Sequence, residues 1–264
     1  MEYELYCENL LNGFVENHVD YFPDYVYKYY DFNGGYLSLK NLTLQFTHPS
    51  NFVDKSECRK DRIKFKNQGK RIREGLLSRE MESLELKLLG KNIDASSILK
   101  LSYKDIEKRS ENEWENTIFK TTGVTCFTTL ENNNFHWENY ANNYSGICVK
   151  YNFKLLMNHF EKSDFFKYCG KQSLNHGPII YVDEIMPVRY GNNNCEKLLM
   201  STNWIFVKER RYQSEKEYRL YSQNCKIDNG YQRVNILKET IDEVFAGKNI
   251  AEEDLDKIKS LGYL

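Results

Sequence analysis

The chain has 264 residues, 41% hydrophobic and 28% charged, a balance typical of a globular protein with a substantial core. Its 37 basic and 38 acidic residues give a net charge of −1, which excludes a general electrostatic attraction to nucleic acid or membrane. No run is apolar enough to span a bilayer, and the acidic N-terminus lacks a signal core. The seven scattered cysteines include no Cys-x-x-Cys pair. We therefore expect neither a disulfide framework nor a metal site, and we expect the protein to be located in a reducing cytoplasm.

The beginning of the chain predicts a helical arm followed by strands. Apolar residues recur near helical spacing until a proline, so residues 1–24 are expected to form an arm that packs on the main domain. Residues 25–30 are rich in strand formers, with Lys28 as a lone cation among aromatic rings. We expect a turn at residues 33–35 and a second extended stretch over residues 36–46.

Residues 55–75 are the one strongly basic segment of the chain. The simpler interpretation is a solvated face or loop, which is the usual role of such a run. The segment also suits phosphate contacts, because Phe65 and Gly69 interrupt the charges as they would in a loop that binds a nucleic-acid backbone. In that interpretation the nucleic-acid-binding residues are Arg59, Arg62, Lys64, Lys66, Lys70, Arg71 and Arg73.

The middle of the chain predicts helices and then a compact strand–helix–strand unit. Leucines at helical spacing predict a helical insertion over about residues 76–120, whose first helix ends at Gly90. Residues 123–129 are expected to form a strand, residues 136–141 a short aromatic helix, and residues 147–151 another strand. The tryptophan of the short helix suits the core, whereas its tyrosine could offer a ring to a planar ligand.

Near the C-terminal end, residues 214–221 alternate in a way typical of a strand. Glu215, Glu217 and Arg219 share one face, which is too charged for an ordinary core face, while the opposite face carries apolar side chains. This stretch alone fits two interpretations equally. One is a surface strand whose ion pairs contribute little. The other is an active-site strand that aims a glutamate into a cleft, with its neighbours setting the charge.

Six short motifs follow one another along the chain. They are Val26-Tyr27-Lys28-Tyr29, Pro49-Ser50-Asn51-Phe52-Val53-Asp54, Cys126-Phe127-Thr128, Trp137-Glu138-Asn139-Tyr140-Ala141, Gly146-Ile147 and Glu215-Lys216-Glu217-Tyr218-Arg219-Leu220. In this order they resemble a large uncharacterised bacterial family associated with defence. The resemblance covers most of residues 25–264. One loop differs, because this chain has Val53-Asp54-Lys55 where the family has Asn-Asp-Pro.

In its layout this family resembles the ADP-ribosyltransferase fold of toxins that act on macromolecules. The resemblance implies an α+β fold, in which residues 25–264 form a single domain with a split mixed β-sheet core and helical insertions. It also implies that Glu217 is the catalytic carboxylate, with Glu215 beside it. The implied cofactor-binding residues are Lys28 and Tyr29 on the first strand, together with His48, Tyr140 and Arg219.

The implied chemistry is cleavage of the bond between nicotinamide and ribose in NAD, which is the substrate, without a metal. Cleavage builds positive charge on the sugar, and a fixed carboxylate stabilises that charge. The second glutamate would orient or deprotonate the acceptor. Lys28 would hold the anionic part of the dinucleotide, and Tyr140 or Tyr29 would stack on the nicotinamide. The sequence has no Gly-rich phosphate loop, which disfavours a Rossmann or P-loop enzyme.

We therefore expect an NAD-dependent ADP-ribosyltransferase that acts as a toxin or antiphage effector in the cytoplasm. Its partner would be a macromolecular acceptor, with nucleic acid (RNA or DNA) slightly favoured over protein because of the basic segment. A cognate antitoxin or chaperone is a further partner that such a toxin can have, and no membrane partner is expected. The alternatives are a non-catalytic module that binds nucleic acid and an NAD glycohydrolase that uses water as the acceptor.

Overall fold

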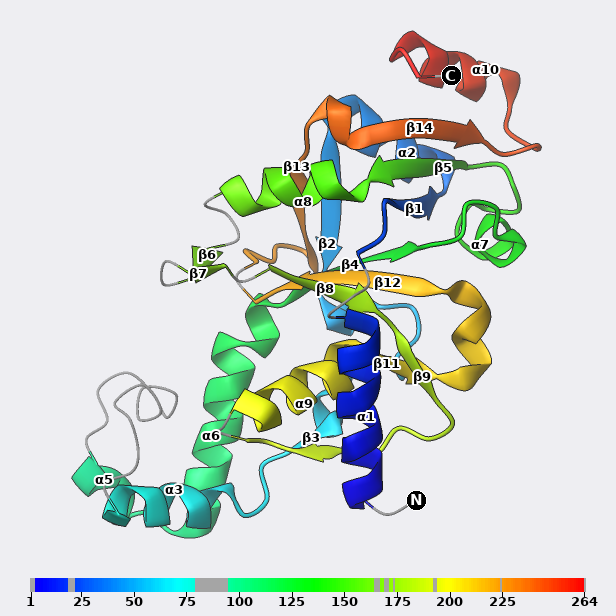
Figure 1. Ribbon diagram of the computed structural model, residues 1–264. Helices are drawn as coiled ribbons and strands as arrows, with labels where there is room; N and C mark the ends of the chain where they lie inside the picture. Colours follow the sequence, from blue (N-terminus) through cyan, green and yellow to red (C-terminus); the bar gives the residue numbers. More distant parts are fainter. Residues whose placement is uncertain are drawn as a thin grey trace.

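The computed structural model describes residues 3–18, 22–78, 95–163, 167–168, 171–172, 174–191, 194–223 and 225–263. An antiparallel sheet of eight strands crosses the molecule, and helices pack at its two ends (Figure 1). The combination of helices and an antiparallel sheet confirms the predicted α+β class.

The helices are α1 (Tyr3–His18), α2 (Phe32–Asn41), α3 (Gln68–Ser78), α5 (Ala95–Leu99), α6 (Tyr103–Thr117), α7 (Asn134–Asn139), α8 (Phe153–Lys162), α9 (Asn194–Ile205) and α10 (Glu252–Ser260). The strands of the main sheet are β1 (Tyr25–Tyr30), β2 (Thr43–Thr47), β4 (Gly123–Thr128), β5 (Ile147–Asn152), β8 (Leu174–Pro178), β12 (Glu217–Ser222), β13 (Tyr231–Asn235) and β14 (Ile241–Ala246). Short two-stranded sheets pair β3 (Ile63–Lys64) with β10 (Val188–Arg189), β9 (Ile180–Val182) with β11 (Val207–Glu209), and β6 (Lys167–Tyr168) with β7 (Lys171–Gln172).

Strand β4 is the point at which the main sheet divides. One edge of β4 pairs with β12 along its whole length, from Thr128 opposite Glu217 to Gly123 opposite Ser222. The other edge pairs with β2 at Val124 and with β1 at Thr128. Strands β1 and β2 therefore leave the same edge of β4 at its two ends and diverge from each other. All pairs in this sheet are antiparallel, so it is not the mixed sheet we expected; the described parallel pairs are β3–β10 and β9–β11.

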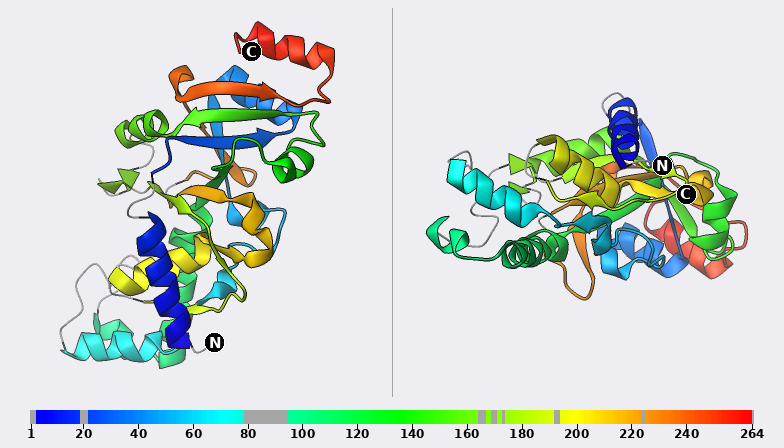
Figure 2. Two further views of the ribbon diagram at one scale, coloured as in Figure 1. Left: turned by 45° about the vertical axis from the view of Figure 1, so that its right-hand side comes forward. Right: turned by 90° about the horizontal axis from the view of Figure 1, so that it is seen from below.

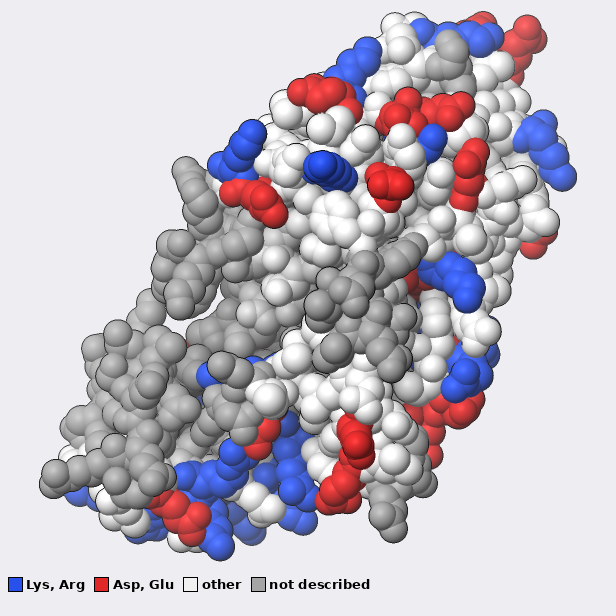
Figure 3. Space-filling model, in the orientation of Figure 1, with Lys and Arg blue, Asp and Glu red and all other residues white. Residues whose placement is uncertain are grey.

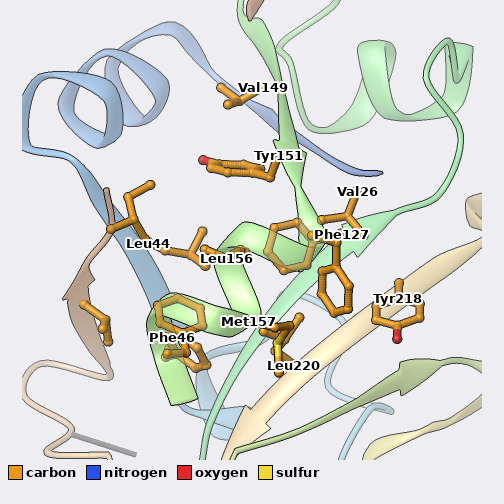
Figure 4. Packing of buried hydrophobic residues seen from close by; sticks show 14 of the residues in the cluster. Val26, Leu44, Phe46, Phe127, Val149, Tyr151, Leu156, Met157, Tyr218 and Leu220 are labelled. Atoms are coloured by element: carbon orange, nitrogen blue, oxygen red, sulfur yellow. The ribbon is translucent and has the colours of Figure 1, made fainter. Parts of the chain in front are cut away.

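Two hydrophobic cores lie on the two sides of β12, whose six residues are all buried. Tyr218 and Leu220 pack into the first core with Phe127 and Met157, beneath α8 (Figure 4). Tyr221, from the opposite face of the strand, belongs to the second core, which is built by α1, α6 and α9. The views in Figure 2 place these three helices at the end of the molecule opposite α10. The alternation predicted for this strand thus holds from its first residue to Tyr221.

The N-terminal helix packs on the rest of the protein, as we expected. Tyr6 and Leu10 are each 1% exposed in the second core, and α1 contacts α9. No helix of the described ranges combines the length and apolar character that crossing a membrane requires. Most of the helix predicted for residues 76–89 lies outside the described residues, and α3 begins earlier, at Gln68.

The turn predicted at residues 33–35 is wrong, because these residues belong to α2. Asp31 caps this helix by accepting a hydrogen bond from the Gly34 backbone N–H at 2.8 Å. The helix ends at Asn41, and the C-cap residue Leu42 has a left-handed φ of 49°. The extended stretch predicted over residues 36–46 is therefore limited to β2. Of the leucines before it, Leu39 faces the core from the helix, whereas Leu37 is 45% exposed.

Candidate active site

A cleft of about 570 Å³ lies beside the point where β1 and β2 diverge. Its walls come from β1, β2, β4, β11 and β12, from the start of α7 to Tyr140, and from the loop at residues 51–57. Strand β12 contributes Glu217 and Arg219 to the cleft from the face opposite Tyr218 and Leu220. The same alternation that buries the apolar side chains therefore aims the charged ones into a cavity.

Lys208 on β11 joins three carboxylates at the base of this cleft. Its Nζ lies 2.7 Å from Glu215 Oε2, 3.0 Å from Glu57 Oε1 and 3.3 Å from Glu217 Oε2. Strand β11 places this lysine opposite Tyr181 of β9. The Tyr181 hydroxyl accepts a hydrogen bond from the Glu217 backbone N–H at 2.9 Å. These bonds fix the start of β12 and its first carboxylate.

Arg219 fixes the same carboxylate from the other side. Its Nε and Nη2 donate to the two oxygens of Glu217 at 2.6 and 3.0 Å, and Nη2 also pairs with Glu57. Its Nη1 donates to the Ile205 carbonyl at 2.7 Å. Because the arginine is 1% exposed, this bidentate pairing is sheltered from water and rigid. We call Glu57, Lys208, Glu215, Glu217 and Arg219 the ion cluster.

Glu215 reaches the ion cluster from outside the strand. It is the last residue of a 3₁₀ turn (Arg210–Glu215), and Lys216 after it has a left-handed φ of 45° that turns the chain into β12. Thr128 on β4 donates to the Glu215 carbonyl at 2.7 Å and holds this turn against the sheet. The residue is 2% exposed. The predicted grouping of both glutamates with Arg219 is therefore present, although Glu215 is not a strand residue.

The two glutamates differ in how readily they ionise. Burial raises the pKa of Glu217, but the positive charges of Arg219 and Lys208 outweigh it and lower that pKa to about 2. Burial raises the pKa of Glu215 to about 7, with Lys208 opposing the rise and the charge of Glu217 adding to it. The cluster holds three carboxylates against two cations, so one carboxylate retains a proton most easily. The pair thus offers one fixed anion and one group that can exchange a proton near neutral pH.

Aromatic side chains form the wall that faces the ion cluster. Asn133 caps α7 by accepting from the His136 backbone N–H, and its amide donates to the Ser214 carbonyl at 3.0 Å, which ties the helix to the chain before β12. Tyr29 donates to the Glu131 carbonyl at 2.6 Å, so its hydroxyl is committed to the fold. Tyr140 is 45% exposed and lines the cleft. Of the two tyrosines proposed to stack on a ligand, Tyr140 is the more accessible.

Lys28 connects β1 to β4 at the place where β1 and β2 diverge. Its Nζ donates to the Cys126 carbonyl on β4 at 2.7 Å, between the positions where β4 pairs with β2 and with β1. Burial lowers its pKa, and the negative charge of Glu217 acts in the opposite direction. Within the described part of the chain, no carboxylate lies within ion-pair distance of this lysine. Lys28 therefore has a structural role and also lines the cleft as a cation.

The structure brings six of the seven expected catalytic and cofactor-binding residues to one cleft: Lys28, Tyr29, Tyr140, Glu215, Glu217 and Arg219. His48 does not line it. That histidine is buried, with Nδ1 2.6 Å from Ser50 Oγ and Nε2 3.0 Å from the Phe119 carbonyl. Its ring packs edge-on against Phe119, so its contacts are those of a core residue.

The basic segment divides into one internal arginine and a charged surface. Arg62 is 6% exposed and donates to the Val207 and Ser56 carbonyls at 2.8 Å, so it is not available to a phosphate. Gly69 does not serve a phosphate loop either, because a Cβ on it would lie 2.1 Å from the Tyr103 carbonyl oxygen; it lets α3 pack closely on α6. Figure 3 shows Lys and Arg side chains gathering over the end of the molecule that carries α3 and β3.

Most of the exposed basic residues have acidic or aromatic neighbours. Arg59 pairs with Asp61, Lys70 with Glu74 at 3.7 Å, and Arg71 with Glu196 at 2.9 Å. Arg73 lies over the Tyr103 ring. Lys64 and Lys66 are exposed and make no ion pair with any residue that the structure describes. These two are the members of the segment best placed to meet an anionic partner.

Sequence reasoning gave no role to the cleft residues Glu57, His136 and Lys208. Lys208 had a local signal, because it interrupts an apolar run that ends at Val207. Glu57 lies within the basic segment, where a single acidic residue does not stand out. Its ion-pair partners lie more than 150 residues away in the sequence. Among the described residues, no group of three or more His, Cys, Asp or Glu is arranged to hold a metal ion.

Comparison with known proteins gives one match. Residues 136–220, about a third of the chain, match the model of a family described as "Protein of unknown function (DUF2971)". No curated protein and no solved structure matches the chain. The matched segment runs from His136, at the aromatic wall, to Leu220 on β12, and it includes Lys208, Glu215, Glu217 and Arg219. Over the part that carries four of the five ion-cluster residues, the chain is thus similar to an uncharacterised family, in line with the resemblance inferred from its motifs.

Proposed function

We propose that this protein is an NAD-dependent ADP-ribosyltransferase that modifies a macromolecule, as a toxin or antiphage effector does. One observation carries the proposal. Two carboxylates with well-separated pKa values, Glu217 and Glu215, lie side by side in a cleft whose opposite wall is aromatic. Two such carboxylates suit a reaction that builds a cation and then transfers a proton.

Glu217 would stabilise the sugar as nicotinamide leaves. The bond between the ribose carbon and the nicotinamide nitrogen breaks, its electron pair goes to the nitrogen, and the sugar carbon becomes cationic. Glu217 stays ionised at physiological pH because Arg219 and Lys208 lower its pKa. Their hydrogen bonds also fix the carboxylate in position before the reaction, which is how a preorganised site stabilises developing charge.

Glu215 would act on the acceptor. The acceptor's nucleophilic atom bonds to the cationic sugar carbon and gives up a proton, which the carboxylate of Glu215 accepts. A base with a pKa near 7 is well matched to this step at neutral pH. Tyr140 would stack on the nicotinamide ring, and Lys28 would contact the pyrophosphate, since it is the cleft cation outside the ion cluster.

The order of the elements supports an ADP-ribosyltransferase-like layout. The lysine–tyrosine pair lies on the first strand, the aromatic residues follow β4, and the glutamate lies on the late strand β12. The strands β1 and β2 diverge next to the cleft, as a split sheet requires. Nucleic acid stays the favoured acceptor, now on the basis of the exposed Lys64 and Lys66.

Release of nicotinamide from NAD by the purified protein tests the proposal. Glu217→Gln should reduce the release by at least about 100-fold, the usual scale for removing one preorganised electrostatic interaction with the transition state. The variant should remain folded, because Arg219 keeps Glu57 and Lys208 keeps Glu57 and Glu215 as partners. The matched control is Glu243→Gln, the same change on β14 with a side chain that is 54% exposed.

Equal release by wild type and Glu217→Gln would refute the assignment. Labelled NAD incubated with RNA, DNA, cell lysate or buffer alone separates the three functional alternatives. Label on a macromolecule indicates a transferase, and free ADP-ribose without an acceptor indicates a glycohydrolase. Salt-sensitive nucleic-acid binding without NAD turnover would instead indicate a binding module.

A further inference from the structure

His136 is a buried histidine at the cleft whose ring has no hydrogen-bond partner. The residue is 7% exposed and lines the cleft from the first turn of α7. Its Nδ1 is fully enclosed and unpaired, and neither ring nitrogen bonds to any residue that the structure describes. Buried polar groups in proteins are nearly always paired, and an unpaired one costs stability unless a ligand completes it. Because the residue lines the cleft, its other ring nitrogen, Nε2, is the one that a ligand can reach.

The enclosure of Nδ1 determines which nitrogen carries the proton. Burial lowers the pKa of His136 to about 4, so the ring is neutral at physiological pH and holds one proton. A buried N–H without a partner costs more than a buried lone pair, so the enclosed Nδ1 holds the lone pair. The proton then lies on Nε2. A neutral ring of this tautomer has one hydrogen-bond donor, Nε2–H, in a residue that lines the cleft.

The aromatic neighbours of His136 limit which ligand group can accept a hydrogen bond from Nε2–H. The ring centroids of Tyr140 and Tyr29 each lie 5.2 Å from that of His136, with planes tilted by 35° and 40°. Tyr29 uses its hydroxyl within the fold, whereas Tyr140 is open to the cleft. A flat ring stacked on Tyr140 would therefore carry its substituent past His136. The substituent that fits a neutral N–H is an oxygen acceptor with no charge.

We infer that His136 is a specificity-determining residue, whose Nε2–H donates a hydrogen bond to the carboxamide oxygen of a nicotinamide ring stacked on Tyr140. This inference rests on the proposed function and assigns the nicotinamide end of the dinucleotide to the α7 wall of the cleft. The ligand would give Nε2 the partner that it lacks in the protein, while the enclosed Nδ1 keeps its lone pair.

The test compares two dinucleotides that differ in one acceptor atom. In thionicotinamide adenine dinucleotide, sulfur replaces the carboxamide oxygen and accepts hydrogen bonds weakly. The wild type should cleave NAD about 5- to 10-fold more efficiently than the thio analogue, as kcat/KM, which corresponds to one neutral hydrogen bond. His136→Leu should lose this preference. His136→Gln, which can place an amide N–H near the position of Nε2, should retain most of it.

A thermal midpoint for each variant separates this role from a structural one. His136→Leu removes an unpaired buried polar atom, so its midpoint should match or exceed that of the wild type. An acetylpyridine analogue of NAD, which keeps the carbonyl oxygen but lacks the amide NH₂, should be cleaved like NAD if the oxygen is the recognised atom.

Two outcomes would overturn the inference, and they are distinguishable from each other. If the wild type cleaves NAD but His136→Leu keeps the preference over the thio analogue, only the role of His136 fails. If the wild type releases no pyridine base from any of the dinucleotides, the proposed function fails and this inference with it.

Discussion

At the scale of single residues, the site depends on the charge balance among the five side chains of the ion cluster, which are largely shielded from water. Lys208 and Arg219 between them contact all three carboxylates of the ion cluster. Removing one carboxylate leaves both cations paired, whereas removing either cation would leave buried negative charges facing one another. Buried charges without partners are strongly destabilising, so the two cations are expected to tolerate substitution least.

Replacing Glu215 by Gln should change how stability depends on pH. The folded protein holds the Glu215 proton more tightly than the unfolded chain, because burial raises its pKa from 4.5 to about 7. Raising the pH through this window therefore destabilises the wild type, by about 3 kcal/mol at most, and leaves Glu215→Gln unaffected by this group. Glu217, with its lowered pKa, contributes stability that is lost only as the pH falls below 4.5 toward 2.

The measurement is the thermal midpoint of wild type and Glu215→Gln from pH 5 to pH 8. The midpoint of the variant should rise relative to that of the wild type as the pH increases, and Glu243→Gln serves as the control for the loss of one glutamate. A difference between wild type and Glu215→Gln that stays constant over this range would contradict the proton-holding role assigned to Glu215.

The sequence predicted much of this site because alternation along a strand is a local property. Glu217 and Arg219 face the cleft, and Tyr218 and Leu220 face the core, as the period of two requires. The contributions of Glu57 and His136 could not be predicted, because each depends on a contact made by tertiary packing. His48 shows the opposite error, since a polar loop position concealed a buried ring bonded to Phe119.

At the scale of secondary-structure elements, α2 shows why a local signal failed. Two adjacent glycines after an asparagine are typical of a turn, yet Asp31 caps a helix there and Leu39 faces the core from it. The second glycine is required by packing, because a Cβ on Gly35 would lie 2.5 Å from Ile147 Cγ1 and 3.1 Å from Tyr30 Cβ. Tertiary contact with β5 and β1 therefore overrides the propensity of the dipeptide.

The neighbouring glycines provide a matched pair for a stability test. A Cβ on Gly34 would lie no closer than 3.4 Å to Asp31, so Gly34→Ala should stabilise the protein by up to about 1 kcal/mol through helix propensity. Gly35→Ala should destabilise it by about 1–3 kcal/mol, because Ile147 would have to shift within a packed core. Chemical denaturation of both variants checks the prediction, and equal effects would show that α2 does not pack on Ile147 as described.

At the scale of the whole molecule, the catalytic proposal and the acceptor proposal concern different regions. The cleft lies beside β4 and β12, and the first hydrophobic core supports the face of β12 that points away from it. The exposed basic residues lie at the end formed by β3, α3 and α6, next to the second core (Figures 1 and 3). A macromolecular acceptor that reaches the cleft could contact both regions, whereas NAD alone would contact only the cleft.

This separation predicts that acceptor binding and NAD cleavage can be uncoupled. Replacing Lys64 and Lys66 together by Gln should weaken modification of RNA or DNA while leaving nicotinamide release without an acceptor unchanged, because neither residue lines the cleft. A plot of log affinity against log salt concentration has a negative slope. For every phosphate that the variant no longer neutralises, this slope should become less steep by about 0.7 to 0.9. The control is the same double change at Lys40 on α2 and Lys154 on α8, exposed lysines at the opposite end of the molecule.

Modification assays and binding titrations at several salt concentrations would provide both measurements. If the Lys64/Lys66 variant and the control variant modify nucleic acid equally well, the acceptor does not contact the basic end. The acceptor would then have to be recognised around the mouth of the cleft, where Val53 is 98% exposed and Tyr140 is 45% exposed. Exposed apolar side chains at that rim would favour a protein acceptor over a nucleic acid, because they offer contact area without charge for a phosphate backbone.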